Sequence, residues 1–86
     1  MDQIETLRKK VDALDLQIIG LLSERAKVCR NIGSLKKQNG MQIRDASREN
    51  QVYQRVTEKA VEFHLDPSQL QAVYREIVNM CSAVQE

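Results

Sequence analysis

Two cations, Arg25 and Lys36, lie eleven residues apart in a stretch whose apolar residues recur with helical spacing. Eleven residues turn an α-helix by about 1100°, within about 20° of whole turns, so the two side chains share one face roughly 16 Å apart. Arg25 also interrupts the apolar spacing. A guanidinium cannot lose its proton, so at a packed position it needs an anion or a route to water. The pair indicates a site for an anionic ligand.

Each polar residue near this face also has a structural explanation. Arg25 could reach solvent or pair with Glu49, which falls on the packed side of a later helix. Lys36 and Glu49 could simply interact favourably with the dipoles of their helix ends. Arg8 lies about 100° around the helix from Arg25, so it can serve the same site only from a second chain.

The element that positions these cations is a long helix, predicted from about Ile4 to Gln38. That stretch contains no proline, and its apolar residues alternate at steps of four and three. The seam consists of Leu7, Val11, Leu14, Ile18, Leu21, Val28, Ile32 and Leu35. Such a helix would be roughly 50 Å long, whereas a globule of this length should be only about 30 Å across. The overhang predicts an intertwined homodimer in which the long first helices pair.

Two shorter helices are predicted after the long one. Asn39-Gly40 marks a helix end, and Asp45 is typical of an N-cap for a helix that runs to about Phe63. Asp66-Pro67 begins a third helix. The expected packing residues are Val52, Val56, Ala60 and Phe63, then Leu70, Val73, Ile77, Met80 and Val84, with a neighbouring row of Tyr74, Val78, Cys81 and Gln85. The fold class is therefore all-α, with three helices per chain in one domain over residues 1–86.

Composition excludes several kinds of function. A net charge of +1 argues against a nucleic-acid surface, and no apolar run or basic leader indicates a membrane or secretory role, so we expect a cytoplasmic chain. Two cysteines and one histidine give no metal cluster, and we expect neither a metal nor another cofactor. Cys29 and Cys81 fall beside packing faces, where we expect reduced thiols rather than a disulfide.

Several motifs recur in order along the whole chain. They are Leu7-Arg8-x-x-Val11-Asp12-x-Leu14-Asp15, Leu21-Leu22-Ser23-Glu24-Arg25, Gly33-x-x-Lys36 and Arg44-Asp45-x-x-Arg48-Glu49, followed by a last helix that ends with Gln85. In this pattern the sequence resembles the all-helical chorismate mutases. The resemblance implies a homodimer of three-helix chains whose long first helices pair.

It also implies an isomerase of aromatic amino-acid biosynthesis, on the shikimate pathway. The reaction converts chorismate to prephenate by a Claisen rearrangement within one molecule, so it needs no nucleophile, metal or other cofactor. It requires a substrate held in a compact conformation and positive charge near the breaking ether oxygen.

By this resemblance, Arg25 and Arg8 of the second chain would bind the two carboxylates of the chorismate dianion, since guanidinium forks match carboxylates. Lys36 and Gln85 would donate hydrogen bonds to the ether oxygen. A neutral amide at position 85 predicts activity that is nearly independent of pH. Two sites per dimer follow, each built from both chains.

The remaining implied roles lie around the ring hydroxyl. Glu49 and the backbone at Asp45 would hold it, and Arg48 would be a supporting charge near Glu49. Cys81 stands where several relatives have serine facing the substrate, and a thiol is a weaker hydrogen-bond donor than a hydroxyl.

Two alternatives stand beside a monofunctional chorismate mutase. An isochorismate-pyruvate lyase shares the fold and much of the cationic pocket, although the stretch from Arg44 to Glu49 looks more like a mutase. A non-catalytic helical dimerisation or regulatory module would use the same seam without the chemistry. It predicts that replacing Arg25 by alanine is tolerated or stabilising.

Overall fold

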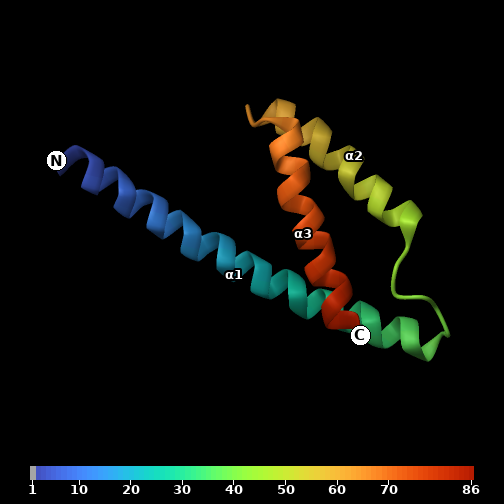
Figure 1. The fold of residues 1–86 in the computed structure, drawn as a ribbon. Helices are drawn as coiled ribbons and strands as arrows, with labels where there is room; N and C mark the ends of the chain where they lie inside the picture. The colour runs from blue at the N-terminus through green and yellow to red at the C-terminus, as the bar shows by residue number, and fades with distance from the viewer. Residues whose placement is uncertain (1) are drawn as a thin grey trace.

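Three α-helices account for most of the chain in the computed structural model, which describes residues 2–86 (Figure 1). They are α1 (Asp2–Gln38), α2 (Ala46–Glu62) and α3 (Pro67–Gln85). No strand occurs in residues 2–86, so the all-α class with three helices is confirmed. Within this range no helix has the length and apolar character needed to cross a membrane.

Local signals at the helix ends explain these boundaries. Gly40 adopts a φ of 64° just after α1, a left-handed conformation that costs glycine little. The Asp45 carboxylate caps α2 by accepting from the Arg48 backbone N–H at 3.0 Å. Asp66 caps α3 in the same way, accepting from Gln69 N–H at 3.0 Å. The predicted ends of all three helices are therefore confirmed to within a few residues.

Helix α3 joins the other two, because the interhelical contacts run between α1 and α3 and between α2 and α3. The first half of α1 extends away from both (Figure 1). The described chain measures 57 × 24 × 15 Å, with a radius of gyration of 16.2 Å. A globule of this length would have a radius of gyration of only about 12 Å. Helix α1 thus overhangs the rest of its chain.

The core lies between α2 and α3. Val52, Val56 and Val78 form its centre. The predicted apolar line of α2 is correct through Ala60, which is fully buried, but wrong at Phe63, which is 66% exposed. Phe63 lies one residue beyond the last residue of α2, where the chain turns away. The buried apolar face of α2 therefore ends at Ala60, one turn before the predicted end at Phe63.

The interior face of α3 differs from the one predicted. Val73 and Met80 were expected in the core but are exposed, whereas Val78, Ser82 and Gln85 are buried. Two apolar rows lie side by side on this helix, and the row that begins at Tyr74 supplies the more deeply buried residues. Of the other row, Leu70 packs partly buried against the core, and Ile77 is half-buried. Periodicity identified both rows without deciding which of them faces inward.

Candidate active site

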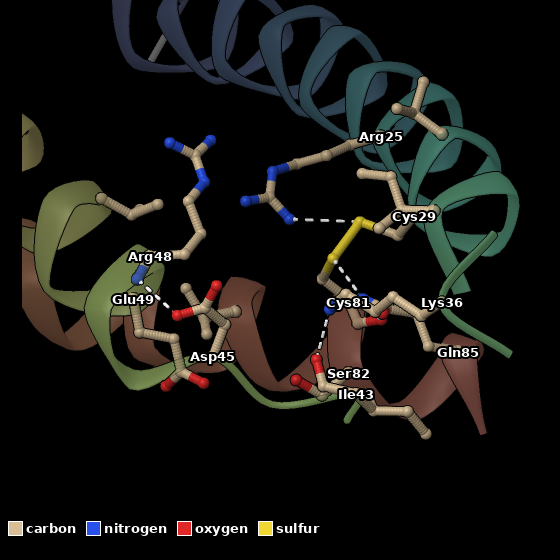
Figure 2. Close-up of a pocket in the computed structure, with 14 residues that line it drawn as sticks. Arg25, Cys29, Lys36, Ile43, Asp45, Arg48, Glu49, Cys81, Ser82 and Gln85 are labelled. Atoms are coloured by element: carbon tan, nitrogen blue, oxygen red, sulfur yellow. Dashed lines mark hydrogen bonds between the residues drawn. A yellow bond between two sulfur atoms is a disulfide. The ribbon is translucent and has the colours of Figure 1, made fainter. Parts of the chain in front are cut away.

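A cavity of about 410 Å³ lies between the second half of α1, the start of α2 and the last turns of α3 (Figure 2). Seven of the eight residues predicted for the site line it: Arg25, Lys36, Asp45, Arg48, Glu49, Cys81 and Gln85. The eighth, Arg8, lies on the overhanging part of α1, where its side chain is 71% exposed and pairs with Glu5 at 3.1 Å. A single chain therefore assembles the predicted site without Arg8.

Arg25 reaches into this cavity from α1 without a carboxylate partner. In residues 2–86 its guanidinium takes part in no ion pair, and its Nη1 donates to Cys29 Sγ at 3.8 Å. Sulfur is a weak acceptor. The pairing with Glu49 considered from the sequence is not formed. The guanidinium thus keeps donors for an incoming anion.

Glu49 is held by residues that the sequence did not indicate. Both of its carboxylate oxygens accept from Arg44 Nη1 at 3.2 Å. Arg44 Nη2 also donates to Asn79 Oδ1 at 2.8 Å, which connects the start of α2 to α3. The sequence predicted Arg48 as a supporting charge near Glu49, and the ion pair with Glu49 is formed by Arg44. Asn79 was missed because its contact crosses between helices.

Lys36 lies at the edge of the cavity, half-buried. Its Nζ donates to the backbone oxygen of Ile43 (Figure 2), which ties the connection after α1 back onto that helix. An ammonium carries three N–H donors, so this contact leaves further donors for a ligand.

Gln85 is buried, with 5% of its surface exposed. Its Nε2 donates to the Cys81 backbone oxygen at 3.1 Å and approaches Cys81 Sγ at 3.3 Å. Its Oε1 has no hydrogen-bond partner among the described residues. Gly33 makes this placement possible, because a Cβ there would lie 2.8 Å from the Cα, Cβ and Cγ atoms of Gln85. Close approach of α1 and α3 therefore fixes the amide at the end of α3.

A disulfide joins Cys29 and Cys81 in the cavity wall, so the expectation of two reduced thiols is wrong. Their Cα atoms lie 5.4 Å apart, within the usual range for a disulfide. Each cysteine lies one helical turn before a residue of the α1–α3 crossing, Cys29 before Gly33 and Cys81 before Gln85. The pair was missed because the sequence does not reveal that α1 and α3 cross at Gly33 and Gln85.

The charge that the cavity lining offers to a ligand is mainly positive, because both carboxylates of the lining already have partners. Asp45 serves as the cap of α2, and Glu49 pairs with Arg44. The cations of the lining are Arg25, Lys36 and Arg48. No set of three or more His, Cys, Asp or Glu side chains in residues 2–86 is placed to hold a metal ion. The arrangement suits an organic anion of small size.

Comparison with known proteins agrees with this geometry. Residues 7–86 match the family described as chorismate mutase type II. A chorismate mutase of Methanocaldococcus jannaschii is 26% identical over 86 residues, covering 100% of this chain and 87% of that protein. A bifunctional chorismate mutase/prephenate dehydratase of Aquifex aeolicus is 32% identical over 89 residues, and the chain spans only 25% of its length.

A solved structure extends the agreement to the fold. It is a conserved hypothetical protein from Pyrococcus furiosus, 30% identical, with a TM-score of 0.77 over 100% of this chain and 99% of that one. The match of motifs, helices and family pattern confirms the resemblance seen in the sequence. The chain belongs to the chorismate mutase type II family of enzymes.

Proposed function

We propose that this chain catalyses the Claisen rearrangement of chorismate to prephenate, a step of aromatic amino-acid biosynthesis. One observation carries the proposal: a single cavity gathers Arg25, Lys36 and Gln85 while Arg25 has no carboxylate partner in residues 2–86. Chorismate is a dianion, and the cavity offers a guanidinium and an ammonium from α1 and a neutral amide from α3.

Catalysis on this proposal consists of restraint and electrostatic stabilisation. Both ends of the rearranging system belong to one molecule, so the protein gains most by holding the compact reactive conformation. Arg25 binds one carboxylate in a charge-assisted contact. Lys36 and Gln85 donate to the ether oxygen, where electron density increases as the C–O bond breaks. The Gln85 amide would donate to the ether oxygen by exchanging its weak contact with Cys81 Sγ for the substrate, while it keeps its hydrogen bond to the Cys81 backbone oxygen.

The ring hydroxyl would bind at the opposite end of the cavity. The Glu49 carboxylate accepts the hydroxyl proton in a hydrogen bond, and its pairing with Arg44 holds it in place. The backbone at Asp45 lies beside it, and Arg48 adds positive charge. Cys81 cannot act as a thiol donor while it is part of the disulfide.

A second copy of the chain would complete the site. The apolar seam of α1 stays uncovered in a single chain, and its first five members, Leu7, Val11, Leu14, Ile18 and Leu21, are 54–63% exposed. Pairing of two α1 helices along this seam buries it and brings Arg8 of the second copy to the other carboxylate of the substrate. Each homodimer then has two such sites.

Direct assay tests the proposal. Purified protein is incubated separately with chorismate and with isochorismate, and the products are identified by chromatography. We expect prephenate from chorismate. Release of pyruvate from isochorismate, without prephenate formation, would instead favour the lyase alternative.

Arg25→Ala distinguishes the enzyme from a non-catalytic helical module. We expect kcat/KM to fall roughly 30-fold to 5,000-fold, because removal of one partner of a buried charge pair costs roughly 2–5 kcal/mol. Arg30→Ala is the matched control, since Arg30 lies on the same helix, is exposed and does not line the cavity. Equal activity of the two variants would contradict the proposed role of Arg25.

A further inference from the structure

The disulfide contacts two of the side chains assigned to substrate binding. Arg25 Nη1 lies 3.8 Å from Cys29 Sγ, and Gln85 Nε2 lies 3.3 Å from Cys81 Sγ (Figure 2). Both cysteines line the cavity. The bond is therefore part of the candidate site as well as a crosslink between helices.

We propose that the Cys29–Cys81 pair is a redox control of this cavity: the disulfide form binds the dicarboxylate substrate, and the dithiol form binds it more weakly. The inference rests on the proposed function for the identity of the ligand. Two separate physical effects both predict weaker substrate binding after reduction.

The first effect is mechanical. Contacts between helices run from α3 to each of the others, so α3 is the helix that packs against both the α1 wall and the α2 wall. The disulfide is the covalent tie between α1 and the last turns of α3, which carry Gln85. Reduction removes this tie and leaves the last turns of α3 held to α1 by noncovalent contacts, which include the hydrogen bond from Lys37 Nζ to the backbone oxygen of Glu86 at 3.2 Å. The amide then samples more positions, which weakens binding that depends on preorganised donors.

The second effect is electrostatic. In the disulfide, the sulfur beside Arg25 is neutral. After reduction it becomes an ionisable thiol, and a neighbouring guanidinium favours the thiolate. A thiolate at Cys29 would accept from Arg25 and compete with the substrate carboxylate for the same donors. The other charged side chains of the lining are Lys36, Asp45, Arg48 and Glu49.

A dithiol reductant would convert the disulfide to two thiols by thiol–disulfide exchange. Cys81 is half-buried, whereas Cys29 is only 4% exposed, so the reductant thiolate attacks Cys81 Sγ. The S–S bond breaks, and Cys29 leaves as a thiolate next to Arg25, which favours its departure. The second thiol of the reductant then displaces Cys81 and closes a cyclic disulfide. Two electrons and two protons pass from the reductant to the two cysteines.

The test compares the full chain in its disulfide form with the same chain after treatment with excess dithiothreitol. Mass spectrometry after alkylation counts the free thiols, and circular dichroism verifies that both forms are helical at the assay temperature. Isothermal titration with prephenate measures affinity in each form. We expect reduction to weaken prephenate binding roughly tenfold. In Cys29→Ser/Cys81→Ser, dithiothreitol should leave the affinity unchanged.

Three outcomes would overturn the redox inference: equal prephenate affinity in the two forms, tighter binding after reduction, or a dithiothreitol response that persists in the double variant. A purely structural crosslink would lower thermal stability on reduction without changing affinity. Chorismate turnover by the disulfide form is measured alongside. Absence of turnover with affinity that still falls on reduction would refute the proposed activity and retain the redox control. Chorismate turnover together with equal prephenate affinities in the two forms would support the proposed activity and refute the redox control.

Discussion

Gly33 is the position where a single added methyl group should damage both stability and catalysis. Its missing side chain allows α1 and α3 to cross with Gln85 at the contact. A Cβ at residue 33 would lie 2.8 Å from three atoms of Gln85, and ordinary van der Waals contact begins at 3.4 Å. One of those atoms is the Gln85 Cα, so the backbone of α3 has to move. Gly33→Ala therefore pushes the end of α3 away from α1.

Two opposing terms set the size of the effect on stability. Alanine is favoured over glycine within a helix by about 1 kcal/mol. Overpacking at a close contact costs about 1–3 kcal/mol. Gly20→Ala isolates the second term, because Gly20 lies in the same helix and a Cβ there meets nothing within 4 Å. We expect Gly20→Ala to be stabilising and Gly33→Ala to be about 1–3 kcal/mol less stable than that control.

Catalysis should respond more strongly than stability. Displacement of a positioned catalytic group by about 1 Å costs on the order of 100-fold in rate. We therefore expect kcat to fall roughly 100-fold in Gly33→Ala and to stay near the parent value in Gly20→Ala. Urea unfolding at one protein concentration gives the stabilities, and chorismate turnover gives kcat. Equal kcat in the two variants would refute the argument that the α1–α3 crossing positions Gln85.

Two further substitutions test single residues of the chain. Gln85→Glu should make kcat rise towards acid pH, because a carboxylate donates only when protonated and an ordinary glutamate pKa is near 4.3, whereas the parent should be nearly flat from about pH 5 to 8; the same pH profile in both would remove Gln85 from the site. His64→Gly should raise the free energy of unfolding by about 1 kcal/mol, because His64 has a φ of 60° and the left-handed region costs a residue with a Cβ about 1–2 kcal/mol. Lower stability of His64→Gly in urea unfolding would contradict the strain at that turn.

Local chemistry explains why the fold was predictable. Gly40, Asp45 and Asp66 mark the helix ends through backbone conformation and side-chain capping, which depend on nearby residues only. The relation of Arg25 to Lys36 was equally accessible, since one helix fixes the angle between them. Residues from all three helices line one cavity, and seven of the eight residues predicted for the site are among them, while their roles stay a prediction.

Contacts between helices explain what the sequence did not reveal. The Cys29–Cys81 disulfide depends on which faces of α1 and α3 meet, and α3 offers two similar rows. The partner of Glu49 depends on the path of the connection after α1, which places Arg44 beside it. Neither relation follows from spacing along one helix.

The central claim is that the cavity becomes a working dicarboxylate site when a second chain supplies Arg8. The most direct measurement mixes Arg8→Ala and Arg25→Ala chains, dissociates them and re-forms dimers, then compares chorismate turnover with that of each variant alone. In the heterodimer one site has both arginines and the other has neither, so turnover should rise from near zero towards half the parent value per heterodimer. No recovery of turnover, with heterodimers shown to be present by native mass spectrometry, would contradict the shared site.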